Sequence, residues 1–182
     1  MKKDGTKRNS VFFGSVKILV FAAFLCAISG VMKLIAPSGD VWRISLENFP
    51  IILSGITMGP IVGGMVGIIA DLLGCIFRGY AINPLITMAS MFVGVISGFV
   101  YKYTKHSKIA IILSSFTAHI IANLFIKTIV LSYMYGMKLI ILFAERGITY
   151  FLTALVECIL LTILLNNKTI RSQLKDVVGY EL

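Results

Sequence analysis

Three polar residues, His119, Asn123 and Lys127, recur at four-residue intervals within an otherwise apolar segment. This spacing places all three side chains on one face of a helix. A charged or amide group is costly to hold in hydrocarbon, so the shared face is expected to line a bundle interior or a wet cavity. An imidazole, an amide and an amine in one column could bind a small polar molecule by hydrogen bonds and charge.

Further polar residues fall near the ends of apolar segments. Arg146 and Tyr150, again four residues apart, begin the last apolar segment, and Glu157 lies two turns deeper. Arg43 and Glu47 are also four apart and could simply pair with each other. For any one of these residues a structural hydrogen bond is an alternative role, but the whole set predicts a polar pocket. The candidate substrate-binding residues are Arg43, Asp71, Arg78, Tyr80, Asn83, Asn123, Lys127, Arg146 and Tyr150.

Asp71 lies about halfway along a glycine-rich apolar segment in which Gly59, Gly63 and Gly67 are spaced four apart. A carboxylate at this depth costs a few kcal/mol unless it is paired or hydrated. Two interpretations stay open: Asp71 contacts a ligand, or it forms a structural ion pair with Arg78 or with an arginine of another helix.

Catalytic, metal and nucleic-acid functions find no support in the sequence. It contains no HExxH, no Ser–His nucleophile pattern, no metal-binding carboxylate pair and no P-loop. The three cysteines lie inside apolar runs, at spacings that match neither a zinc site nor a disulfide framework. The net charge of +9 comes from basic residues at the ends of apolar segments and not from one polar face. We therefore expect no enzyme activity, cofactor, metal or nucleic-acid partner.

The elements that position these residues are predicted to be membrane helices. The chain is 58% hydrophobic and only 14% charged, which one soluble core of 182 residues cannot accommodate. A helix needs roughly 20 apolar residues to cross the bilayer. We predict an all-α integral membrane protein, a single membrane domain with a six-helix bundle over residues 15–165, whose helices span about 15–36, 44–57, 59–77, 84–101, 109–134 and 139–165.

The placement of Lys and Arg predicts the orientation of the bundle. The basic N-terminus (residues 1–14), the linker at 102–108 and the polar tail at 166–182 fall on one side if there are six spans. Because cytoplasmic loops are enriched in Lys and Arg, both termini are predicted to be cytoplasmic.

Two small residues in the first helix, Ala23 and Ala27, form a flat stripe on its surface. Such stripes let two helices approach closely in lipid. The stripe could face another protein or another helix of the same chain.

Taken together, these patterns resemble the substrate-binding S component of energy-coupling factor (ECF) vitamin transporters. The resemblance covers about Val16 to Leu165 and rests on chain size, six helices, the alanine stripe and two stretches. These stretches are Arg43-Ile-Ser-Leu-Glu-Asn-Phe-Pro50-Ile-Ile-Leu-Ser-Gly55-Ile-Thr-Met-Gly59-Pro60 and Gly63-Gly-Met-Val-Gly67-Ile-Ile-Ala-Asp71-Leu-Leu-Gly74. They look most like the folate-type branch.

The resemblance implies a function and partners. S components capture a vitamin from outside a prokaryotic cell, dock on a membrane scaffold subunit through helix one (here Ala23 and Ala27), and depend on two cytoplasmic ATPases. Loops near residues 37–42 and 78–83 would cap the ligand, and Arg146 occupies the place of a ligand-contacting arginine. For folate, Asp71 or Asn123 could face the pterin ring, and Arg43, Arg78 and Arg146 could bind the glutamate carboxylates.

Two alternatives remain. The chain could be an S component for another vitamin, such as pantothenate, thiamine or riboflavin. It could be a non-catalytic structural membrane subunit whose buried polar groups merely pair. A small membrane enzyme or a channel would need a reactive constellation or a continuous polar path, neither of which the sequence offers.

Overall fold

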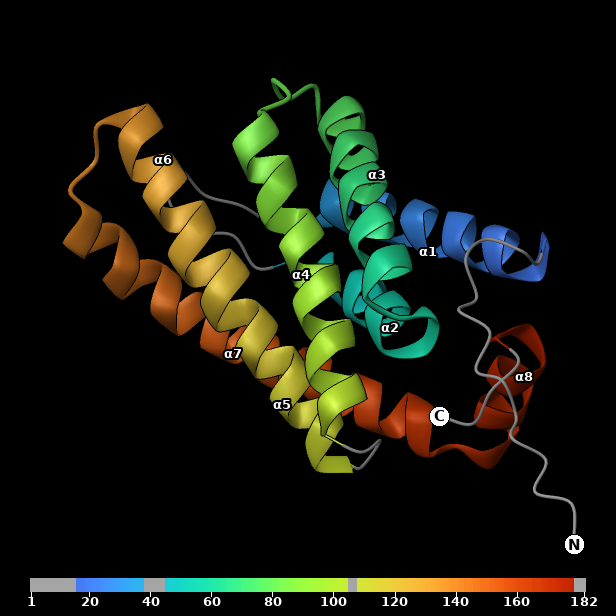
Figure 1. Ribbon diagram of the computed structural model, residues 1–182. Coiled ribbons are helices and arrows are strands. Elements are labelled where there is room, and N and C mark those ends of the chain that lie inside the picture. Colours follow the sequence, from blue (N-terminus) through green and yellow to red (C-terminus); the bar gives the residue numbers. More distant parts are fainter. Residues whose placement is uncertain (1–15, 38–44, 105–107, 179–182) are drawn as a thin grey trace, which may run out of the picture.

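The computed structural model describes residues 16–37, 45–104 and 108–178, and every regular element within these ranges is helical (Figure 1). The all-α prediction is therefore confirmed. In chain order the elements are α1 (Val16–Ile35), α2 (Asn48–Met58), α3 (Pro60–Arg78), α4 (Pro84–Tyr103), α5 (Lys108–Ala118), the π-helix η1 (His119–Lys127), α6 (Thr128–Tyr135), α7 (Leu139–Asn166) and α8 (Lys168–Val178).

Five helical runs of the described chain are long and apolar enough to cross a membrane. They are α1, α3, α4, the continuous run from α5 through η1 to α6, and α7. They match five of the six predicted spans. The sixth, expected at 44–57, is the 11-residue helix α2, whose length of about 16 Å reaches only half-way across hydrocarbon.

Helix α2 is enclosed by the rest of the bundle, since all its residues except Phe49 are buried. It packs against α3 and α4, and glycines allow the three helices to meet at their backbones. A Cβ atom on Gly63 would lie 2.6 Å from Gly55 Cα and 2.8 Å from Gly94 O. A Cβ on Gly94 would collide with the Gly63 carbonyl. Gly63, the middle one of the three evenly spaced glycines, thus makes a helix–helix contact inside the protein.

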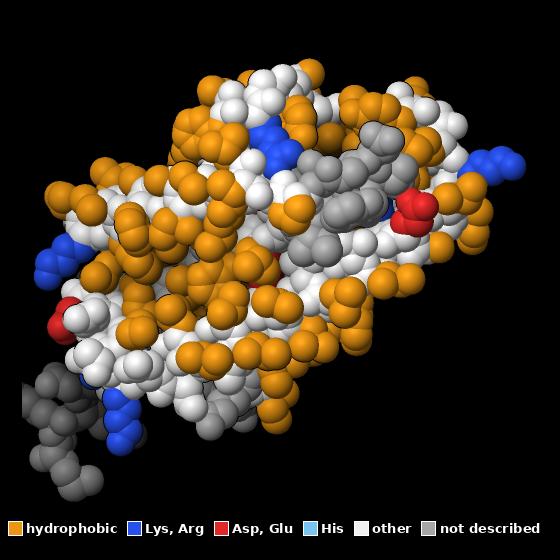
Figure 2. Space-filling view, turned by 180° about the vertical axis from the view of Figure 1, so that it is seen from behind, with side chains coloured by type: hydrophobic (Ala, Val, Ile, Leu, Met, Phe, Trp, Pro, Cys, Tyr) orange, Lys and Arg blue, Asp and Glu red, His pale blue; other side chains and the backbone are white. Residues whose placement is uncertain are grey.

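The outer surface of the bundle is apolar. Hydrophobic side chains are spread across the face shown in Figure 2, and only a few charged side chains appear there. On α1, for example, Leu19, Val20 and Phe24 are each more than half exposed. Apolar surface on this scale suits lipid and not water.

The polar tail contains an additional helix, α8, that the sequence analysis did not anticipate. Leu174 and Val178, four residues apart, are buried in the main hydrophobic core, while Lys168, Arg171 and Lys175 are exposed. The helix packs against α1 and α7. Helix α8 is therefore part of the bundle, because one face of it is apolar at helical spacing.

Candidate functional site

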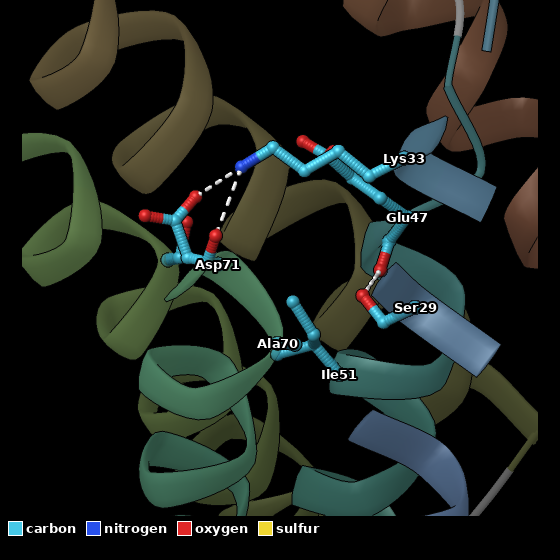
Figure 3. A pocket seen from close by; sticks show the side chains of 7 residues that line it. Ser29, Lys33, Glu47, Ile51, Ala70 and Asp71 are labelled. Carbon is cyan, nitrogen blue, oxygen red and sulfur yellow. Dashed lines mark hydrogen bonds and ion pairs between the residues drawn. The ribbon is translucent and has the colours of Figure 1, made fainter. Parts of the chain in front are cut away.

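A buried ion pair joins α1 to α3. Lys33 Nζ donates to Asp71 Oδ1 at 2.6 Å, and the Thr87 hydroxyl of α4 donates to Asp71 Oδ2 at 2.8 Å. The two charged side chains are 6% and 3% exposed (Figure 3). Asp71 is thus held by a lysine of the first helix, and not by Arg78 as one interpretation of the sequence expected.

Arg78, at the end of α3, binds the C-terminal end of α1. Its guanidinium donates to the carbonyls of Lys33 (2.8 Å), Leu34 (2.9 Å) and Ala36. It also donates to the Tyr80 hydroxyl at 3.1 Å and lies over that ring. The last carbonyls of a helix lack partners within the helix, so this arginine acts as a side-chain cap on α1.

Asn83 begins α4 as its N-cap. Its Oδ1 accepts from the backbone N–H of Leu85 at 2.9 Å and of Ile86 at 3.4 Å. This is the usual capping role of an asparagine, here directly before Pro84 at the first helical position.

A second buried cluster lies between η1 and α7. His119 Nε2 and Glu157 Oε2 are 2.7 Å apart, and Asn123 Nδ2 is 3.2 Å from His119 Nδ1. His119 is 2% exposed, and Asn123 and Glu157 are fully buried. The histidine and asparagine project from the π-helical part of the fifth span, a widened helix type that often accompanies functional sites.

Glu47, immediately before α2, stands between the two clusters. Its carboxylate Oε1 lies 3.9 Å from Lys127 Nζ, and its backbone carbonyl accepts from the Ser29 hydroxyl at 2.6 Å. The Lys127 ammonium also attracts the Asp71 carboxylate, whereas the carboxylates of Glu157 and Glu47 repel each other. The two clusters therefore form one polar network around the N-terminus of α2.

Arg146 and Tyr150 border this network on α7. The guanidinium carbon of Arg146 lies 5.6 Å from the centre of the Tyr150 ring, and that ring is 6.3 Å from the His119 ring. Arg146 Nη1 is buried and has no hydrogen-bond partner in the described chain. An arginine nitrogen in this state can donate to a carboxylate.

A shallow hollow lies beside the first cluster, lined by Ser29, Lys33, Glu47, Ile51, Ala70, Asp71 and Ser90 (Figure 3). Its side chains leave no room for even a water-sized molecule. Vitamin-sized ligands occupy pockets of about 300–1,000 Å³, so these side chains must move before such a ligand can enter. Across the described ranges no three His, Cys, Asp or Glu side chains gather as a metal site requires.

The structure divides the predicted site residues into two groups and places one outside the described ranges. Asp71, Asn123, Lys127, Arg146 and Tyr150 belong to the polar network or border it. Arg78, Tyr80 and Asn83 lie at the junction of α3 and α4 and contact backbone or neighbouring side chains there. Arg43 lies outside the described residues.

Three residues central to the network are not among the predicted site residues: Lys33, His119 and Glu157. A signal existed for each. Lys33 is a charged residue in an apolar run. His119 shares the four-residue spacing of Asn123, and Glu157 is an acid deep in the last span.

The alanine stripe of α1 faces outward. Ala23 and Ala27 are exposed, whereas Ala22, Cys26 and Ser29 on the other side of the helix are buried. The stripe therefore does not pack against another described helix of this chain.

Comparisons with known proteins agree on one family. Residues 17–167 match the family described as ECF transporter, substrate-specific component. The folate transporter FolT of Clostridium novyi (strain NT) is 28% identical over 133 residues, covering 72% of this chain and 77% of that protein.

Two solved structures share the fold. The crystal structure of FolT bound with folic acid is 24% identical, has a TM-score of 0.73, and covers 84% of this chain and 94% of that one. The S component of a bacterial ECF transporter is 23% identical, has a TM-score of 0.63, and covers 82% of this chain and 94% of that one.

Proposed function

The chain belongs to the family of ECF transporter substrate-specific components, and from this premise we propose that the substrate it captures is folate or a closely related pterin. As a member of that family it is a multi-pass protein of the prokaryotic cell membrane. Its partners are a membrane scaffold subunit and cytoplasmic ATPases.

The observation that carries the folate proposal is the match to a curated relative named a folate transporter, which extends over 72% of this chain. The site is chemically suited to folate in two respects. Folate has a glutamate tail with two carboxylates, and Arg146 offers a buried, unpartnered N–H group. Folate also has an aromatic head, and the Tyr150 ring provides a surface for stacking.

The candidate residues are proposed to have unequal roles. We assign Asp71, Asn123, Lys127, Arg146 and Tyr150 to the ligand or its immediate surroundings. Arg78, Tyr80 and Asn83 are proposed to border the ligand from the junction of α3 and α4, where Arg78 and Asn83 also bond backbone groups and the Tyr80 hydroxyl accepts from Arg78. Entry of folate must displace side chains now packed in the network, because the hollow beside Asp71 is too small for it.

We further propose how the bundle is organised. The short helix α2 is its sixth element, residues 1–182 form a single membrane domain, and both termini are cytoplasmic. The substrate is proposed to enter from outside the cell. The exposed Ala23 and Ala27 are proposed to face the scaffold subunit. The chain itself is proposed to be non-catalytic, with ATP hydrolysis carried out by its partners.

The proposal is tested by ligand binding to the full-length protein purified in detergent. Isothermal titration with folic acid, pantothenate, thiamine and riboflavin should give tight binding of folic acid alone. Arg146→Ala should lower the affinity for folic acid by about 10- to 100-fold, because a charged hydrogen bond contributes about 1.5–3 kcal/mol. Thr149→Val on the same helix is a matched control, since its hydroxyl bonds to the Glu145 carbonyl of its own helix.

Each alternative predicts a different titration. Tight binding of another vitamin would show that the chain is a substrate-specific component with a substrate other than folate. A monodisperse protein that binds none of the four, and carries no ultraviolet-absorbing molecule after purification, would contradict the folate assignment and favour a structural subunit.

A further inference from the structure

Three buried oxygen atoms of the polar network have no hydrogen-bond donor within the described residues: Asn48 Oδ1, Asn123 Oδ1 and Glu157 Oε1. Asn48 is 3% exposed, and the other two side chains are fully buried. An acceptor buried without a donor costs about 1–3 kcal/mol, and more when it is charged. Three of them on elements that pack together make this region suited to a group rich in N–H donors.

The three acceptors are neighbours. Asn123 is joined to Glu157 through His119. The backbone N–H of Phe49, the residue after Asn48, donates to Leu46 O at 3.1 Å and also interacts with the Glu157 carboxylate. The acceptors thus come from η1, α7 and the first turn of α2, and Glu157 lies beside that turn.

The hydrogen bonds of His119 determine which atoms are left free. If Nε2–H donates to Glu157 Oε2, the neutral ring accepts at Nδ1, and the amide of Asn123 supplies that donor. In this arrangement the Asn123 nitrogen donates to the His119 ring, and the Asn123 oxygen points away from that ring. It also commits one carboxylate oxygen of Glu157 and leaves Oε1 available.

We propose that Glu157 Oε1, with Asn123 Oδ1 and Asn48 Oδ1, receives the amino group and adjacent ring N–H of the ligand's pterin head, and that His119 is a positioning residue for the Glu157 carboxylate. This inference rests on the proposed function. A pterin presents a pair of hydrogens on one edge, one from its exocyclic amine and one from the neighbouring ring nitrogen, and the second amine hydrogen points to the other side. A carboxylate is the strongest acceptor a side chain offers to such an edge.

The assignment also sets the direction of the ligand. Glu157 and Arg146 are eleven residues apart on α7, which is about 16 Å along a helix. An extended folate can bridge such a distance, with its ring at Glu157 and its glutamate carboxylates at Arg146. The acceptors also act against other vitamins. The flavin ring of riboflavin places a carbonyl oxygen on each side of its N–H, so these oxygens would face protein acceptors.

The test compares folic acid with 2-desamino-2-methylfolic acid, which lacks the exocyclic amine, by titration of the full-length protein in detergent. Wild type should bind the analogue about 10- to 100-fold more weakly. In Glu157→Gln the ratio of the two affinities should shrink by about fivefold, because the neutral amide oxygen is a weaker acceptor. Thr153→Val, one turn earlier on α7, should keep the wild-type ratio, since its hydroxyl bonds to the Thr149 carbonyl.

The positioning role of His119 has its own readout. His119→Gln retains an N–H able to reach Glu157, so it should keep most of the preference for folic acid over the analogue. His119→Phe should lose that preference. A merely structural histidine would change the affinities for both ligands equally and leave their ratio intact.

The outcomes separate this inference from the proposed function. If folic acid binds tightly but wild type does not distinguish the analogue, or Glu157→Gln keeps the full ratio, the head-group assignment is wrong and the folate function stands. If well-folded wild type does not bind folic acid, both fail. Should Glu157→Gln not remain monodisperse, the wild-type ratio decides alone.

Discussion

Lys33 of α1 and Asp71 of α3 form an ion pair of 2.6 Å inside the bundle, with both side chains almost completely buried. A lysine within an apolar span is tolerated because its charge is met by the carboxylate and the carboxylate is also bonded by Thr87. The pair fixes α1 against α3 at the same end where Arg78 caps α1. The stabilisation by the ion pair and the stabilisation by the Arg78 cap should therefore depend on each other.

Removing one partner of the Lys33–Asp71 pair should destabilise the protein strongly. Lys33→Met or Asp71→Leu alone leaves a buried charge without compensation, at a cost of about 3–5 kcal/mol. The double variant Lys33→Met/Asp71→Leu should recover most of that loss. Reversible unfolding in mixed micelles measures all three, and additive losses in the double variant would show that the two charges are energetically independent.

The role of Arg78 as a cap predicts that charge alone cannot replace it. Arg78→Lys keeps the cation but loses the fork that reaches three carbonyls. We expect a loss of about 1–3 kcal/mol in stability, measured as a lower thermal midpoint, with folic acid affinity changed less than by Arg146→Ala. A larger loss of affinity than of stability would instead make Arg78 a direct ligand contact.

The contact between α3 and α4 should not accept even one methyl group. Gly94→Ala would place a Cβ against the Gly63 backbone, and overpacking of this kind costs about 1–3 kcal/mol. Gly147→Ala, in the interior of α7, meets nothing within 4 Å and should instead stabilise its helix by about 0.5–1 kcal/mol. Thermal unfolding of the two variants should thus shift in opposite directions.

Enlarging the alanine stripe should affect the partner and not the ligand. Ala23→Leu and Ala27→Leu fill an exposed surface, so folding and vitamin binding should persist while co-purification with the scaffold subunit is lost. Ala144→Leu makes the same change at an exposed alanine of α7 and should leave the complex intact. Retention of the complex by both α1 variants would exclude this face as the docking surface.

The long helices could be predicted from sequence because each is a single apolar run bounded by Pro, Gly or basic residues. Helix α8 was also readable, since Ile170, Leu174, Val177 and Val178 have helical spacing, but its polar average obscured that pattern. The π-helical stretch could not be predicted, because the spacing of apolar residues does not reveal one locally widened turn.

The site was harder to predict because its partners lie far apart in the chain. Asp71 was recognised as a buried acid, but its lysine is 38 residues earlier and Glu157 is 38 residues beyond its histidine. Spacing rules relate residues within one helix only. Arg78 was misleading for another reason: its partners are backbone carbonyls, which carry no sequence signal.

The two sides of α1 have a mechanical consequence. Ser29 and Lys33 face the interior, where they bond Glu47 and Asp71, while Ala23 and Ala27 face outward. A helix with its side chains is only about 10–12 Å thick. A single helix diameter therefore separates the interior contacts with Glu47 and Asp71 from the exposed alanine stripe, so one helix connects the polar network to the outer surface.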